Sequence, residues 1–467
     1  MDIRKIPNLK NEKNCVACGN CVVVCPQKAI KMVQGKINLY PEIDNEKCVK
    51  CYKCIEACNA TYKPSKTNVT HYICQSRDKE ILKKSSSGGV FSLLSDFVLS
   101  RHGVVFGAAY CDEKLSVMHI ACKTKSELYK CQKSKYVQSD HTVILNELEK
   151  SVKEKKWILF TGTPCQCDSI KRKYCNYERL IIADFYCHGV SNIGVFSNYL
   201  SEIGGAEVVD FRSEGAQEPN FYITIKNKNK SIQEYASENI FYRLFISSAN
   251  IKKACFDCAY ANKTHPSDFT MGDFDYPELL DARVMQNHVS ILSINTDKGT
   301  EIFESIKDQF FYKKITDNKI LRKYYRKHNE LNGDWGYDLD KQHKFISDYE
   351  KNGFWRAGYK SEYLEDLELC LRIIKESGDA KVWFCGAGRR SKILGDIIKN
   401  LNFNINFAGY IDSNIHNKES DDCIIKQFEN ISEDEAYNDI FVITVYGDLK
   451  LVLKEKLDRI MVKRIIM

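Results

Sequence analysis

The sequence predicts a multidomain protein of mixed α/β and α+β class. Its 467 residues exceed the size that one hydrophobic core usually supports. Residues 15–58 carry a duplicated run of cysteines, the middle of the chain alternates apolar strands with helical segments, and a strand–helix–strand pattern begins near residue 381. We therefore expect a dicluster module over 1–64, a central α/β core over 70–150 and 151–316, a connector over 317–370, and a Rossmann-like βαβ domain over 371–467.

The cysteine repeat predicts a ferredoxin-like module with two [4Fe-4S] clusters. Both runs have the spacing C-x-x-C-x-x-C-x-x-x-C, the first from Cys15 to Cys25 and the second from Cys48 to Cys58. In two-cluster ferredoxins, the fourth cysteine of each run binds the cluster of the other run. One predicted ligand set is therefore Cys15, Cys18, Cys21 and Cys58, and the other is Cys48, Cys51, Cys54 and Cys25.

Local features around the repeat agree with this module. The alternating runs 29–33 and 36–40 flank Gln34 and Gly35, which predicts a β-hairpin. A pair of zinc sites is the alternative, but a double run of eight cysteines without histidine disfavours it. Pro26 follows the first run, whereas Asn59 stands at the equivalent place in the second. Because proline shapes the turn and binds no metal, the predicted ligation is unaffected.

Composition argues against several other classes of protein. No apolar run approaches the roughly 20 residues of a membrane helix, so we expect no membrane span. The N-terminal residues lack the apolar stretch of a secretory signal, which predicts a cytoplasmic protein whose clustered cysteines bind metal and do not form disulfides. The net charge of +7 is small and the basic residues are scattered among acids, so we expect no nucleic-acid partner.

A serine- and glycine-rich turn precedes a predicted helix in the first part of the central core. Ser85 to Gly89 are followed by apolar residues at helical spacing from Val90 onward. Bare amides at a helix N-terminus suit the pyrophosphate of a flavin or dinucleotide, although such a turn often serves only as a helix cap. The segment 133–139, with Lys135 and Tyr136, either contacts a cofactor or faces solvent.

Two predicted strands each deliver a cysteine at their carboxyl ends. The strand 157–160 is followed by Gly162-Thr163-Pro164-Cys165-Gln166, and the strand 180–185 by Cys187-His188-Gly189. Because strands of α/β sheets end at a common ligand crevice, Cys165 and Cys187 can converge, with buried unreactive thiols as the alternative. A further pair, Cys255-x-x-Cys258, fits a third cluster, a zinc half-site or a redox pair.

These motifs, in this order, resemble the coenzyme F420 hydrogenase/dehydrogenase beta-subunit family. The similarity covers roughly residues 8–315 and rests on the dicluster module, SSSGGVF, KSKYVQS, GTPCQ, CHGV and the C-x-x-C that precedes DFTMGDF. The resemblance implies a flavin, FAD, that exchanges electrons with iron–sulfur clusters. It also implies a third [4Fe-4S] cluster, with the ligands Cys165, Cys187, Cys255 and Cys258.

The resemblance further implies residues for the flavin and for catalysis. The flavin region maps onto Ser86, Ser87, Gly88, Gly89, Lys135 and Tyr136. His188 either relays a proton or hydrogen-bonds a cluster sulfur, and Asp268 and Asp273 either orient a loop over the flavin or cap local amides.

The function implied is a flavin- and iron–sulfur-dependent oxidoreductase acting on an unidentified organic substrate or a deazaflavin, with ferredoxin or another low-potential carrier as partner. The alternatives are a non-catalytic electron-transfer subunit and an enzyme that modifies a glycan precursor by redox chemistry. The last alternative comes from the C-terminal segment, where Gly386-Ala387-Gly388 follows a strand and Asp412 ends the next. This resembles an incomplete dinucleotide fingerprint, because Ser391 occupies the third glycine position, so the segment either binds a nucleotide or is purely structural.

Overall fold

The chain folds into two units, residues 1–343 and 344–467. The computed structural model describes residues 7–12, 14–58, 69–213, 222–260, 265–274, 279, 288–322, 324, 338–412 and 424–467. Several sheets and many helices are present, which confirms the predicted mixed α/β class with more than one domain.

The N-terminal part of the first unit is a small module, called here the cysteine module (residues 7–58). Its elements are α1 (Asn20–Val23), β1 (Ile30–Gln34), β2 (Leu39–Ile43) and α2 (Lys53–Glu56). Strands β1 and β2 pair antiparallel around the turn at Gly35, which confirms the predicted hairpin. Each short helix follows a residue with positive φ, Gly19 before α1 and Tyr52 before α2, so the two cysteine runs share one local conformation.

The central core (residues 69–322) is built on an eight-stranded sheet with the order β13-β3-β12-β11-β7-β6-β4-β5. Strands β4, β6, β7 and β11 are parallel, and the remaining strands are antiparallel to their neighbours. The strands are β3 (Thr70–Ser76), β4 (Val104–Cys111), β5 (Ser116–Cys122), β6 (Ile158–Thr161), β7 (Leu180–Phe185), β11 (Phe269–Asp273), β12 (Ser290–Ile294) and β13 (Phe310–Ile315).

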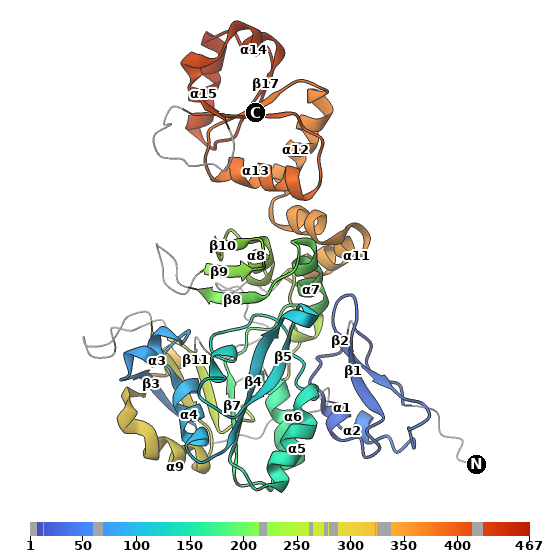
Figure 1. Cartoon of the computed structure of the whole chain (residues 1–467), viewed down its shortest axis with the longest axis vertical. Coiled ribbons are helices and arrows are strands. Elements are labelled where there is room, and N and C mark those ends of the chain that lie inside the picture. Colours follow the sequence, from blue (N-terminus) through green and yellow to red (C-terminus); the bar gives the residue numbers. More distant parts are fainter. Residues whose placement is uncertain are drawn as a thin grey trace. The chain divides into compact units, whose positions relative to one another are not determined.

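Helices cover both faces of this sheet (Figure 1). They are α3 (Lys79–Lys83), α4 (Val90–Leu99), α5 (Leu145–Lys153), α6 (Pro164–Tyr174), α7 (Ile193–Glu202), α9 (Asp297–Ile306) and α10 (Asn318–Arg322). A further helix, α8 (Ile240–Ile246), instead packs through Phe241 against Phe196 of α7 and against Phe211. Along β7, Ile181 packs with α4 and α9, whereas its neighbour Ile182 packs with α5 and α6. Alternate side chains of a strand point to opposite faces, and β7 is apolar on both because both faces are covered.

The predicted segments 70–150 and 151–316 contribute strands to one sheet. Strand β3, from the first predicted segment, pairs with β12 and β13 from the second. These pairings join residues more than 200 positions apart, so no local pattern could reveal them. A separate three-stranded antiparallel sheet of β8 (Val208–Ser213), β9 (Tyr222–Lys226) and β10 (Ser231–Tyr235) completes the unit.

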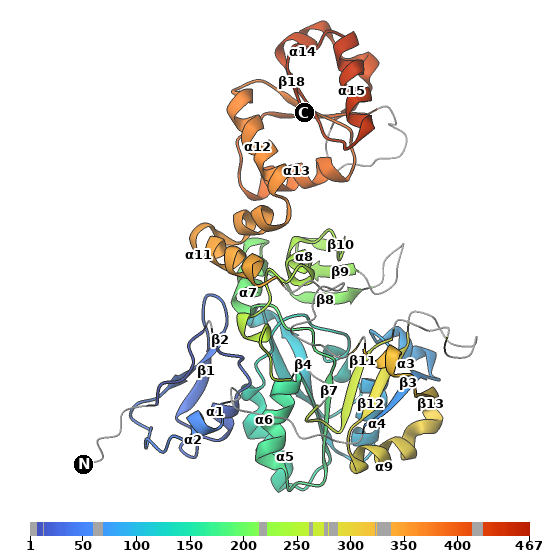
Figure 2. The same cartoon turned by 180° about the vertical axis from the view of Figure 1, so that it is seen from behind.

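The cysteine module packs directly on the central core, where α1 contacts α6 (Figures 1 and 2). The amide of Gly194, in α7, donates to the Ile37 carbonyl at 2.8 Å, and the Asn38 side chain donates to Asn192 at 2.6 Å. A Cβ added at Gly194 would overlap the Lys36 carbonyl oxygen. The module and the core therefore approach at backbone distance, which requires glycine at this position.

Replacing this glycine should loosen the contact between module and core. For Gly194→Val we expect the free energy of unfolding of holo-protein to fall by about 1–3 kcal/mol, because the added atoms overpack a closed interface. Urea unfolding followed by circular dichroism measures the effect. The matched control is Gly395→Ala in α13, where an added Cβ meets nothing within 4 Å and stability should hold or rise. Equal stability of Gly194→Val and wild type would contradict the tight approach.

A buried histidine predicts how stability of the central core depends on pH. His71, on β3, lies 2.5 Å from the Ser293 hydroxyl, and burial together with His265 lowers its pKa to about 4. An unfolded chain binds that proton near pH 6.5, so folding becomes less favourable as the pH falls from about 6.5 to about 4. We expect His71→Gln to reduce the acid slope of the unfolding free energy by up to about 1.4 kcal/mol per pH unit. Urea unfolding between about pH 7.5 and 5 tests this, and an unchanged slope would refute it.

The C-terminal unit is a parallel five-stranded sheet with the order β16-β15-β14-β17-β18. Its strands are β14 (Val382–Cys385), β15 (Phe407–Ile411), β16 (Ile425–Lys426), β17 (Ile440–Ile443) and β18 (Ile465–Ile466), and its helices are α12 (Leu364–Ser377), α13 (Arg389–Asn400), α14 (Glu433–Asn438) and α15 (Asp448–Arg459). The predicted strand–helix–strand unit is therefore present. The Asp412 carboxylate accepts a hydrogen bond from the Ala387 amide at 2.8 Å, so it stabilises the glycine turn.

The boundary of this unit differs from the predicted one. The unit begins at residue 344, within α11 (Leu339–Glu362), and α12 packs against α13. Residues 344–370, expected to be connector, thus belong to a folded unit because apolar side chains such as Leu367 and Cys370 are buried in it. Residues 325–337 of the expected connector lie outside the described residues. Within the described part of the chain, no helix is long and apolar enough to cross a bilayer.

Candidate functional site

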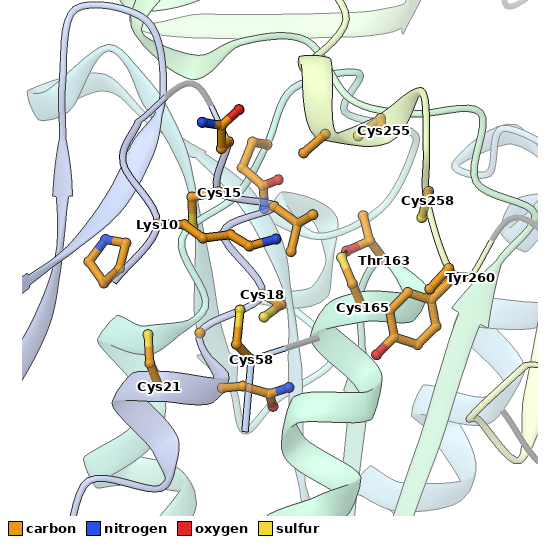
Figure 3. Close-up of a pocket in the computed structure, with 18 of the residues that line it drawn as sticks. Lys10, Cys15, Cys18, Cys21, Cys58, Thr163, Cys165, Cys255, Cys258 and Tyr260 are labelled. Carbon is orange, nitrogen blue, oxygen red and sulfur yellow. Dashed lines mark hydrogen bonds between the residues drawn. The ribbon is translucent and has the colours of Figure 1, made fainter. Parts of the chain in front are cut away.

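Nine cysteines from the cysteine module and the central core line one cavity of about 800 Å³, called here the cysteine cavity (Figure 3). These are Cys15, Cys18, Cys21, Cys54, Cys58, Cys165, Cys187, Cys255 and Cys258. Figure 3 shows Cys18 and Cys58 on the module side, facing Cys165, Cys255 and Cys258 on the core side. Among the described residues, no three His, Cys, Asp or Glu side chains converge as ligands of a single metal ion. The thiols instead lie at separate points on the wall of the cysteine cavity.

The module places its cysteines in two groups. The thiols of Cys15, Cys21 and Cys58 are close enough to Cys18 to raise its pKa further, after the larger effect of burial. A second, smaller cavity is lined by the other group, Cys25, Cys48, Cys51 and Cys54. Cys54 lines both cavities and so lies between the groups. Each run thus contributes its fourth cysteine to the neighbourhood of the other run, which is the arrangement that the spacing predicts.

Cys165 is presented by the N-terminus of α6. Thr163 caps this helix in a capping box with Gln166, Pro164 occupies the first turn, and the Thr163 hydroxyl lies 3.1 Å from the Cys165 sulfur. Burial raises the pKa of Cys165 to about 12, whereas the Lys252 ammonium acts in the opposite direction. The GTPCQ motif is thus a helix-start signal that also fixes a thiol at the positive end of the helix dipole.

The loops that carry Cys187 and Cys255 are held together by backbone contacts. Ser191 bridges to Val137 on one side and to Ile251 on the other, and the Lys252 amide donates to the Val190 carbonyl at 3.0 Å. Gly189 has a φ of +86°, and a Cβ there would lie 2.9 Å from an Ile251 methyl carbon. The glycine of the CHGV motif therefore allows the two cysteine loops to approach each other.

Sequence reasoning missed two polar groups beside these thiols. Lys252 is fully buried, and its ammonium donates to Gln138, which lines the cavity, at 3.4 Å. Tyr260 also lines the cavity and donates to the buried Asp168 carboxylate at 2.7 Å, which in turn accepts from Arg172 at 2.6 Å. A buried ammonium offsets the negative charge of a thiolate-bound cluster. Only the fold brings these residues to Cys165, so no local signal could have found them.

The structure brings together the two predicted parts of the flavin region. The amide of Ser134 donates to the Ser86 hydroxyl at 3.0 Å, so the turn 85–89 lies beside the segment 133–136. Arg212, which sequence reasoning missed, donates to the Tyr136 hydroxyl, to the Asp273 carboxylate and to the Ser86 carbonyl at 2.9, 2.9 and 3.2 Å. The ammonium of Lys135 donates to nearby carbonyls, and burial lowers its pKa to about 8.

The glycines of this turn have a structural purpose as well. A Cβ at Gly88 would overlap the Cys74 carbonyl oxygen, and the Gly88 amide donates to Ser290 at 2.8 Å. Gly89 has a φ of +82° and precedes the first residue of α4. Ser87 donates to the Val289 carbonyl at 2.7 Å. The turn is thus anchored between β3 and β12, and its role toward a flavin stays a prediction.

The remaining predicted residues, His188, Asp268 and Asp273, do not line the cysteine cavity. His188 is half-buried beside Cys187 and is not among the residues that line the cysteine cavity. Asp268 accepts from the Ile182 amide at 2.9 Å and pairs with Lys298 at 3.0 Å, so it joins β7 to α9. Asp273 is half-exposed and pairs with Arg212 at 2.9 Å, which connects it to the predicted flavin region.

Comparison with known proteins assigns two parts of the chain. Residues 155–318 match the family model that describes the C terminus of the beta chain of coenzyme F420 hydrogenase/dehydrogenase. Residues 14–61 match the model of the 4Fe-4S dicluster domain. Both matches confirm the resemblance that the motifs indicate.

Individual proteins are similar over more limited regions or at lower similarity. A polyferredoxin-like protein of Methanocaldococcus jannaschii is 39% identical over 66 residues, which are 12% of this chain and 38% of that protein. The chain therefore spans well under half the length of this relative. A chain of the F420-reducing [NiFe] hydrogenase complex from Methanosarcina barkeri has a TM-score of 0.39 and 15% identity, covering 60% of this chain and 92% of that one.

Proposed function

Because residues 14–61 match the 4Fe-4S dicluster domain and residues 155–318 match the C terminus of the coenzyme F420 hydrogenase/dehydrogenase beta subunit, we propose that this protein is an iron–sulfur flavoprotein oxidoreductase. Electrons would pass between the clusters of the cysteine module, a third cluster in the central core and an FAD. The reaction would reduce or oxidise a small organic substrate or a deazaflavin. Ferredoxin or a similar low-potential carrier would be the external electron partner.

The observation that carries this proposal is the shared cysteine cavity. Thiols of the module, including Cys18 and Cys58, face Cys165, Cys255 and Cys258 of the core across one volume. The Cys18 thiol is close enough to Cys165 to influence its pKa. If the module served only as an independent electron carrier, Cys18 and Cys58 would not need to lie opposite the cysteines of the core. This arrangement favours an enzyme with an internal electron path.

The donor set fits iron–sulfur clusters. Thiolates are the usual ligands of such clusters, and the cavity of about 800 Å³ is lined by cysteines on opposite sides. Burial keeps the free thiols protonated, since it raises the pKa of Cys21 and of Cys165 to about 12, so loading a cluster has to release protons. A bound [4Fe-4S] cluster supplies one-electron transfer.

Basic groups near the predicted flavin turn support the flavin part of the proposal. Lys133, Lys135 and Arg212 lie around Ser86 and Tyr136, and their positive charges suit a diphosphate. Two of these cations are paired with carboxylates, Lys133 with Asp210 and Arg212 with Asp273. When bound, a flavin exchanges two electrons with an organic substrate and single electrons with clusters.

Anaerobic purification tests the proposal. Iron, sulfide and released flavin are quantified per chain, and absorption spectra are taken before and after dithionite. About twelve irons and one flavin per chain would support three clusters and the flavoenzyme. About eight irons without flavin would refute the FAD and the third cluster and would leave a two-cluster electron-transfer subunit.

A further inference from the structure

Two buried thiols outside the predicted ligand sets lie against each other in the central core. Cys122 ends β5, and Cys131 follows the short helical turn Leu128–Lys130. Their sulfur atoms are 3.6 Å apart. Neither thiol lines the cysteine cavity or the smaller cavity of the module. Sulfur atoms at this separation are in van der Waals contact, and a disulfide bond would bring them to roughly 2.05 Å.

The surroundings make the two thiols chemically unequal. The Cys122 thiol donates to the Glu127 carbonyl at 3.6 Å, and the contact between the two sulfurs, in which either can donate, lowers the pKa of Cys131 and raises that of Cys122. The ammonium of Lys135 and the amide of Gly107 also favour the thiolate of Cys131. A thiolate is the form that attacks a disulfide, so Cys131 is the better nucleophile of the two.

Access distinguishes the thiols in the same way. Cys131 keeps 9% of its surface exposed, whereas Cys122 keeps none, so a small reagent reaches Cys131 first. A Cβ at Gly107 would lie only 3.2 Å from the Cys131 sulfur, so the missing side chain at Gly107 makes room for this thiol. The Cys131 sulfur is thus both the better nucleophile and the more accessible of the two, whereas the Cys122 sulfur is fully buried.

We propose that Cys122 and Cys131 form a redox-active dithiol that exchanges two electrons with small disulfides. The Cys131 thiolate attacks one sulfur of R–S–S–R, which forms a mixed disulfide and releases RS⁻. The released thiolate takes the proton of Cys122, whose sulfur then attacks Cys131 and expels the second RS⁻. That thiolate takes up the proton that Cys131 lost to solvent, so two electrons and two protons pass from the pair to the reagent. The exchange needs no flavin, because both electrons come from the two sulfurs.

Anaerobic equilibration of holo-protein with 2-mercaptoethanol and 2-hydroxyethyl disulfide tests the proposal. After acid quenching and alkylation, trypsin separates Cys122 and Cys131 into the peptides 115–123 and 131–133. We expect these peptides to be joined by a disulfide under oxidising conditions and separate under reducing ones. The oxidised-to-reduced ratio should change about tenfold for each tenfold change in [RSSR]/[RSH]². Two alkylated thiols at every ratio would overturn the proposal.

Two variants locate the disulfide. Cys122→Ser should leave Cys131 as a mixed disulfide with the reagent, because the resolving sulfur is gone, whereas Cys131→Ser should leave Cys122 reduced. The matched control is Cys175→Ser, which removes an exposed cysteine and should leave the joined peptides unchanged. The rate at which the reagent modifies Cys122 in Cys131→Ser is compared with the rate at which it modifies Cys131 in Cys122→Ser. Equal rates would overturn the assigned roles.

Discussion

Cys165→Ala should remove one whole cluster and leave the other two. The thiol stands at the N-terminus of α6 and faces the cysteine cavity, where alanine offers no ligand. We expect iron to fall by about four per chain, from about twelve to about eight, with an equal loss of sulfide. The paramagnetic resonance signal of dithionite-reduced protein should lose about one spin per chain. Reduction of the proposed flavin by an external low-potential carrier should fall to the background rate.

Cys167→Ala is the matched control for this prediction. Cys167 lies on the same helix two residues later, but it is fully buried, its thiol donates to the Gly162 carbonyl at 3.5 Å, and it does not line the cavity. This variant should keep all its iron although it loses a similar volume. If Cys165→Ala also keeps about twelve irons, the proposed third ligand set is wrong.

Paired alanine variants in the cysteine module should reveal crossed ligation. The structure groups Cys58 with Cys18 and Cys21, and Cys25 with Cys54. Cys58→Ala should therefore lose about four irons, and adding Cys18→Ala should lose no more, since both remove the same cluster. Adding Cys51→Ala instead should double the loss to about eight irons, because it removes the second cluster as well.

Iron analysis and spin quantitation of the single and double variants measure this pattern. The third cluster is the internal reference, since its proposed ligands are untouched in every variant and its roughly four irons should persist. The opposite pattern would indicate sequential ligation. In that case Cys58→Ala with Cys18→Ala would lose about eight irons and Cys58→Ala with Cys51→Ala about four.

Much of the local structure follows from the sequence because it depends on neighbouring residues. The hairpin around Gly35, the strand Leu180–Phe185, the helix beginning at Val90 and the strand Phe407–Ile411 all occur where apolar periodicity and turn residues predict them. The eight cysteines of the module are likewise visible as a spacing. The GTPCQ and CHGV motifs could also be identified in the sequence. The structural role of each residue within them could not be predicted.

Pairings between distant residues were outside the reach of such patterns. Strand β3, from the predicted segment 70–150, belongs to the same sheet as β12 and β13, from the segment 151–316. The C-terminal unit begins within α11 and so takes in residues expected to be connector. Arg212 and Lys252 give no local signal, since their importance lies in the side chains that surround them.

The sequence alone therefore determined which chemistry the cysteines can perform, because thiol spacing and helix-start signals are local properties of the chain. Only the tertiary structure decided that Cys18 and Cys165 face one cavity, that Gly88 and Gly194 are needed for close backbone packing, and that Cys122 touches Cys131. These contacts arise when a sheet with long crossovers closes and a separate module packs on it. Their geometry depends on how whole elements fit together, and no window along the chain contains that information.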